Sequence, residues 1–195
     1  MTSSRKYNRD ILLTIFQDQR TVFRLKDIAM LTGETNHTSL NKKINYYVRT
    51  HRLHNPRKGL YVKPDYSKEE LACKLFTPSY ISMDYVLQKA GIIFQYDPTI
   101  TSVSYLSRSV KVEGQKYTYH KLKEKIMIDT SGIIRQLNHI NIATPERAIL
   151  DTLYLNPHAY FDNLNTIKIN KLSELLPIYQ SKTLTSRVKS LFQNV

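Results

Sequence analysis

Residues 37–62 read HTSLNKKINYYVRTHRLHNPRKGLYV, and their pattern predicts the main elements of the first part of the chain. Its apolar side chains recur at helical spacing, which predicts a helix from about residue 37 to His51 with one face in a core. These side chains are Leu40, Ile44, Tyr47 and Val48. We expect Asn36 or Thr38 to cap the N-terminus of this helix. Turn-forming residues at 55–59 lead into an apolar run at 60–62, so a β-hairpin should follow.

The same stretch is strongly basic. No acidic residue lies between Glu34 and Asp65, although seven lysines and arginines do. The whole chain has a formal net charge of +13, which predicts a polyanionic partner or an acidic protein partner. We expect the polar face of the predicted helix and the tip of the hairpin to contact double-stranded DNA. The residues concerned are Ser39, Lys42, Lys43, Tyr46, Arg49, Arg57 and Lys58. A solvated basic surface is the alternative interpretation.

Two shorter helices precede this stretch. Apolar residues at helical spacing predict one over residues 8–19 and another over 25–31 that Gly33 ends, with a short β-like piece at 21–23 between them. Three helices followed by a basic hairpin are the elements of a winged helix-turn-helix domain, which we assign to residues 1–66. In such a domain the third helix enters the major groove of DNA.

A second domain is expected over residues 67–195, because Pro64 and the polar run after it are typical of a linker. Its pattern is mixed α and β, so the fold class of the chain is α+β. The β part is an antiparallel meander through Val103, Val110 and Tyr117, with further short strands near 133–134 and 140–143. The predicted helices cover residues 67–76 and 82–90, a segment that starts at Pro145, and two C-terminal segments around 171–176 and 184–192.

No pattern for enzyme chemistry emerges from the sequence. GxSxG, P-loop, HExxH and GxGxxG motifs are missing, so we expect neither catalytic residues nor a cofactor. The single cysteine, Cys73, lies among apolar neighbours and should be buried. His51 and His54 have i,i+3 spacing but lack further ligands, so no metal site is expected. Arg147 and Asp151 at i,i+4 predict a structural ion pair.

The sequence does not predict a membrane protein. It contains no apolar run of the roughly 20 residues that span a bilayer, and its first residues, MTSSRKYNRD, lack the apolar segment of a secretory signal. We therefore expect a cytoplasmic protein.

Three separated motifs carry a resemblance to a known family. They are RKGLY at residues 57–61, PSYIS at 78–82 and TPERAILD at 144–151. In this order and spacing they resemble the AbiEi-type antitoxins. The resemblance implies an antitoxin of a bicistronic toxin-antitoxin system that acts in abortive phage infection or in element maintenance, with a toxin that resembles a nucleotidyltransferase. It also implies that the N-terminal domain represses the shared promoter by binding inverted repeats, and that the C-terminal domain neutralises the toxin. A homodimer on the DNA is one arrangement that we consider.

A second basic set lies in the predicted meander and could form an exposed sheet surface for an acidic partner or RNA, or simply be solvated. It consists of Arg108, Lys111, Lys116 and Lys121. Two other functions remain open. One is a stand-alone transcription regulator whose C-terminal domain senses a ligand or dimerises, and the other is an enzyme such as a nuclease or a kinase-like neutraliser.

Overall fold

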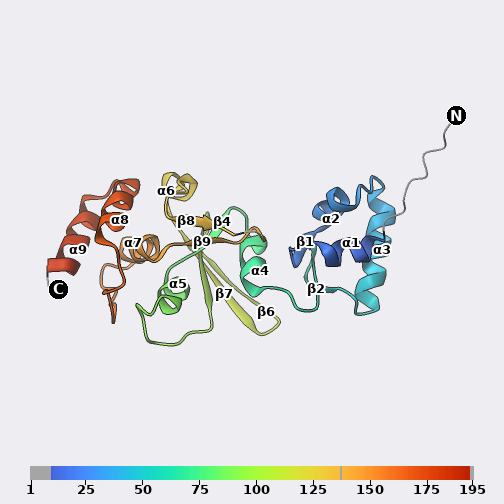
Figure 1. Ribbon diagram of the computed structural model, residues 1–195, viewed down its shortest axis with the longest axis horizontal. Coiled ribbons are helices and arrows are strands. Elements are labelled where there is room, and N and C mark those ends of the chain that lie inside the picture. Colours follow the sequence, from blue (N-terminus) through green and yellow to red (C-terminus); the bar gives the residue numbers. More distant parts are fainter. Residues whose placement is uncertain (1–9, 137, 194–195) are drawn as a thin grey trace. The chain divides into compact units, whose positions relative to one another are not determined.

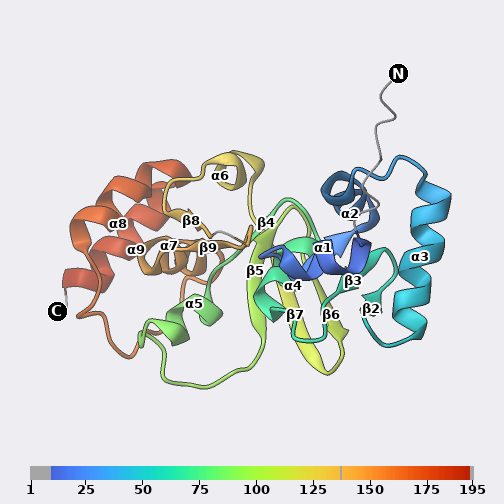
Figure 2. The same cartoon turned by 45° about the vertical axis from the view of Figure 1, so that its right-hand side comes forward.

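The computed structural model describes residues 10–136 and 138–193 and has the mixed α and β composition that the sequence predicts. The chain divides into two compact units, residues 1–71 and 72–195. The predicted division lies after residue 66, ahead of the helix α4 (Lys68–Leu75). Figures 1 and 2 together label the α-helices and strands of both units, and each unit is described by itself below.

The first unit combines short helices with a small antiparallel sheet. Within residues 10–71, strand order in this sheet is β1-β3-β2. The elements are α1 (Ile11–Gln17), β1 (Val22–Arg24), α2 (Leu25–Thr32), α3 (His37–Arg49), β2 (His54–Arg57) and β3 (Leu60–Val62). One apolar core joins the helices and the sheet, and its fully buried members include Ile15, Phe23, Ile28, Leu40 and Ile44.

Local capping explains where these helices begin and end. The Asn36 side chain accepts a hydrogen bond from the backbone N–H of Ser39 at 3.0 Å, which confirms the predicted start of α3. The predicted end of α2 at Gly33 is also confirmed. The first helix is shorter than predicted because Asp10 caps it and Asp18 is extended. The predicted start at Asn8 lies outside the described residues.

The hairpin differs from the expected one in its turn. We expected residues 55–59 to form the turn, but β2 continues to Arg57 and only Lys58 and Gly59 connect the strands. The reason is the Asn55 side chain, whose Nδ2 donates to the carbonyl oxygens of Leu60 at 2.6 Å and of Arg57 at 3.1 Å. The bond to Leu60 joins β2 to β3 where their register is irregular, and the bond to Arg57 stays within β2.

The second unit is built on one mixed sheet. Within residues 72–136 and 138–193 this sheet has six strands in the order β6-β7-β5-β4-β9-β8. The strands are β4 (Ser79–Ile81), β5 (Ile100–Ser104), β6 (Arg108–Val112), β7 (Gln115–Lys121), β8 (Ile133–Arg135) and β9 (Asn141–Ala143). The helices are α4 (Lys68–Leu75), which begins in the first unit, α5 (Asp84–Lys89), α6 (Glu124–Ile128), α7 (Pro145–Leu155), α8 (Ile169–Leu175) and α9 (Lys182–Gln193), with a 3-10 turn η1 (Leu176–Tyr179).

The predicted antiparallel meander is wrong. Strands β6 and β7 do form an antiparallel hairpin, but β5 pairs in parallel with β7 and not with β6. Alternation of polar and apolar side chains predicts a strand but not which strand pairs with it. The burial of side chains is consistent with the strand order found here. Tyr117 and Tyr119 on β7 are buried, which suits a strand with a neighbour on each side, whereas β6 alternates with exposed residues and lies at the edge.

Helix α7 is the centre of the second unit. It begins after the cap Thr144, as predicted, and its residues from Glu146 to Leu153 are all buried. Figures 1 and 2 show α8 and α9 beside it in the red part of the ribbon. The segment predicted around 171–176 is α8, which ends at Leu175, directly before η1, and α6 was not predicted from the sequence. Cys73 is buried, as expected.

Candidate nucleic-acid interface

Helix α3 presents one face to the core of the first unit and one to solvent. Leu40 and Ile44 are fully buried, while Tyr47 and Val48 pack at the margin of the core. Of the predicted DNA-contacting residues on α3, Lys42, Tyr46 and Arg49 are exposed, and Ser39 and Lys43 are half-buried. Figure 2 shows α3 in cyan, next to β2 and β3.

Lys43 is engaged within the protein. Its Nζ lies 3.7 Å from a carboxylate oxygen of Glu34, a residue of the turn before α3. This ion pair places Lys43 at the flank of the outer face rather than at its centre. The centre is held by Lys42 and Arg49, for which the structure gives no acidic partner within the described chain.

Three further polar residues of α3 were not among the predicted DNA-contacting residues, although the helical period already put them on the outer side. Thr38, Asn41 and Asn45 are exposed along α3. The hydroxyl of Tyr61 on β3 donates to Oδ1 of Asn41 at 3.3 Å. This bond fixes the position of the hairpin strand against α3.

The hairpin tip is exposed at both predicted positions, Arg57 and Lys58. Lys63, which follows β3, is half-buried, and its Nζ donates hydrogen bonds to the backbone carbonyls of Phe16 and Asp18. Burial lowers the pKa of Lys63. Arg57 and Lys58 are thus exposed at the hairpin tip, whereas Lys63 connects the end of the sheet to α1.

The basic set of the second unit does not form one surface. Lys111 and Lys116 are cross-strand partners, and strand alternation puts them on the face opposite to Arg108 and Lys121. Arg108 is half-buried, with its guanidinium carbon 4.2 Å from the ring centre of Phe76. The expected exposed basic sheet surface with all four residues is therefore wrong.

The second and third sequence motifs meet inside the second unit. The carboxylate of Asp151, on α7, accepts hydrogen bonds from the hydroxyls of Tyr80, Ser82 and Tyr179. Nε of Arg147 lies 3.5 Å from Asp151, and both side chains are fully buried. The predicted structural ion pair is confirmed.

Arg147 is also held by the backbone. Its guanidinium donates to the carbonyl oxygens of Ile126 at 2.7 Å and of Ser131 at 3.1 Å. Burial raises the pKa of Asp151, while the positive charge of Arg147 opposes the rise. The cluster is closed to solvent, so we assign it to the stability of the fold.

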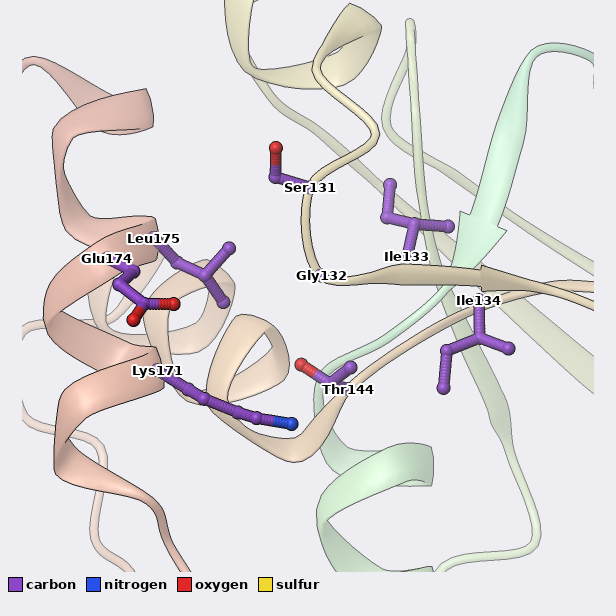
Figure 3. A pocket seen from close by; sticks show the side chains of 8 residues that line it. All are labelled: Ser131, Gly132, Ile133, Ile134, Thr144, Lys171, Glu174 and Leu175. Carbon is purple, nitrogen blue, oxygen red and sulfur yellow. The ribbon is translucent and has the colours of Figure 1, made fainter.

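An open pocket of about 450 Å³ lies next to this cluster, between β8 and α8. Figure 3 shows Ile133 and Ile134 on one side of it and Lys171 and Glu174 on the other. Its lining mixes one basic, one acidic and several apolar side chains. This mixture does not select one kind of ligand.

Over residues 10–136 and 138–193, no three His, Cys, Asp or Glu side chains gather in an arrangement that could bind a metal ion. In the same part of the chain, every helix is too short or too polar to cross a bilayer.

No protein-family model matches the sequence, and no curated protein matches it at a significant level. In fold, the chain is similar to the crystal structure of the RV2827C protein from Mycobacterium tuberculosis. The two structures align with a TM-score of 0.56 over 94% of this chain and 75% of that chain, at 12% sequence identity. This likeness concerns the fold alone.

Proposed function

We propose that the first unit is a winged helix-turn-helix domain that binds double-stranded DNA, with α3 in the major groove and the β2–β3 hairpin against neighbouring phosphates. The observation that carries the proposal is the outer face of α3, where Lys42, Tyr46 and Arg49 are exposed in a stretch without acids. The hydrogen bond between Tyr61 on β3 and Asn41 on α3 supports it, because it ties the hairpin strand to the proposed recognition helix.

Our proposal for the whole chain is a cytoplasmic, non-enzymatic antitoxin that represses its own promoter. A homodimer would bind an inverted-repeat operator, and the second unit would oppose a toxin that resembles a nucleotidyltransferase. The support is the resemblance of the three motifs to AbiEi-type antitoxins. Two of these motifs contribute Tyr80, Ser82, Arg147 and Asp151 to the buried cluster, so they specify a common packing arrangement.

DNA binding is tested by fluorescence anisotropy with the full chain and duplexes from the region upstream of its gene. Lys42→Ala and Arg49→Ala should each weaken binding and, for a phosphate contact, reduce the slope of log K against log salt by about 1. Lys68→Ala is the matched control, because Lys68 is an exposed lysine at the start of α4. Equal affinity and equal slope for all three variants would refute the α3 interface.

The antitoxin role is tested by growth rescue and a promoter reporter in the same cells. The product of the neighbouring gene is expressed with the full chain or with the Lys42→Ala/Arg49→Ala double variant. We expect both proteins to restore growth, but only the unaltered chain to repress the promoter. If neither restores growth while repression by the unaltered chain persists, the antitoxin role fails and a stand-alone regulator explains the chain better.

A further inference from the structure

A line of exposed polar residues runs along the middle of α3. Thr38, Lys42, Asn45 and Arg49 are spaced at i, i+4, i+7 and i+11 and are all exposed. At 100° per residue their directions fall within about 60° of one another, over a length of about 16 Å. Lys42 lies opposite the buried Leu40 and Ile44, so this line is the part of α3 that a DNA groove would meet first.

Asn45 differs chemically from the other members of the line. A side-chain amide combines a donor and an acceptor in one plane, as two hydrogen bonds to the edge of a base require, whereas lysine and arginine only donate. In the major groove, asparagine makes this pair of bonds with N6 and N7 of adenine. The charged neighbours at i−3 and i+4, Lys42 and Arg49, can hold the helix against phosphates on either side of such a contact.

The other asparagines near α3 are already used within the protein. The Asn36 side chain caps the helix, and Oδ1 of Asn41 accepts the hydrogen bond from Tyr61. Within the described part of the chain, the Asn45 side chain has no hydrogen bond to another residue, and it is exposed. Its donor and its acceptor are therefore both available to a ligand.

We infer that Asn45 is a specificity-determining residue that reads one adenine in the major groove of the operator. The inference rests on the proposed DNA-binding function and deepens it. Lys42 and Arg49 then supply affinity, and replacing Asn45 alters which sequences are bound more than how tightly DNA in general is held.

The experiment is a selection from a pool of random duplex DNA with the full chain and with Asn45→Ala, followed by anisotropy titrations on the selected duplex. In a series of these titrations, each adenine of the selected duplex is replaced in turn by 7-deazaadenine, which removes the N7 acceptor and keeps the base pair. Asn45→Gln is the conservative variant, because a glutamine amide can make the same pair of bonds. Asn170→Ala, which removes an exposed amide from α8, is the matched control.

We expect the unaltered chain and Asn170→Ala to lose about 5- to 100-fold in affinity when a single adenine pair is replaced by a G·C pair, and to lose affinity at the same position with 7-deazaadenine. Asn45→Ala should bind all these duplexes within about twofold of one another, and Asn45→Gln should keep part of the preference. An identical adenine preference for Asn45→Ala and the unaltered chain would overturn the assignment of Asn45 while leaving DNA binding intact. Failure of the unaltered chain to retain any duplex would overturn both the inference and the proposed function.

Discussion

Replacing Asp151 by asparagine should strongly destabilise the second unit. Asparagine keeps the size of the side chain but removes the negative charge that faces Arg147 at 3.5 Å, and it offers one acceptor oxygen where the carboxylate offers two. Three hydroxyls donate to that carboxylate, so at least one of them loses a good partner. Because Arg147 is fully buried, its charge has no access to water. Leaving a buried charge without its counter-ion costs about 3–5 kcal/mol.

The assay is native-state hydrogen exchange, with mass spectrometry of peptides from α7. This method reports the opening of the second unit without assuming that both units unfold together. For Asp151→Asn, exchange should accelerate by about two to four orders of magnitude. Asp65→Asn, which alters an exposed carboxylate of the first unit, should leave α7 unchanged.

A double-mutant cycle checks the cause. The double variant Arg147→Met/Asp151→Asn should lose less opening free energy than the sum of the losses in the two single variants, because it contains no unpaired buried charge. An opening free energy for Asp151→Asn within about 1 kcal/mol of the unaltered chain would mean that Asp151 carries no charge in the folded protein. That result would refute the ion pair as a source of stability.

Two further predictions concern other positions. Gly132→Ala should lower the free energy of unfolding by roughly 2–5 kcal/mol, because the added Cβ would lie 3.1 Å from Cβ of Arg147 in a left-handed backbone conformation. Gly91 has the same conformation with open space around it, so Gly91→Ala should lower this free energy by only about 1 kcal/mol. Urea unfolding measures both changes. Hydrogen bonds from Arg20 hold the pKa of Asp18 below its usual value, so this pair stabilises the fold above the unfolded pKa of about 3.9 and the benefit is lost as pH falls through the folded pKa. The difference in unfolding free energy between the unaltered chain and Asp18→Asn should therefore shrink on acidification, and a difference that stays constant from pH 7 to pH 2 would contradict this assignment.

Local signals predicted the first unit well. The period of Leu40, Ile44, Tyr47 and Val48 placed α3 correctly, because a helix side and its cap depend on residues only a few positions apart. The outer face was predicted less completely. Because of its positive charge, Lys43 was predicted to contact DNA, although it pairs with Glu34. The neutral Asn45 on the same helix was not included in that prediction.

The second unit shows what local patterns cannot supply. Strand pairing depends on contacts between distant segments, so the parallel pairing of β5 with β7 could not be read from alternating residues. The grouping of Arg108 with Lys111 was a different error, because alternation along a single strand already puts residues three positions apart on opposite faces of β6. By contrast, the contact between Arg147 and Asp151 was predictable, because i,i+4 spacing within one helix fixes it.

The charge on β6 also bears on how the sheet ends. In the described chain β6 is an edge strand, with β7 as its neighbour on one side. A lysine in the middle of an edge strand opposes the addition of a strand from another molecule, since pairing would bring its charge against a second backbone and its side chains. Lys111 occupies such a position and is exposed. Its charge therefore opposes the edge-to-edge pairing of β6 with a strand of another molecule.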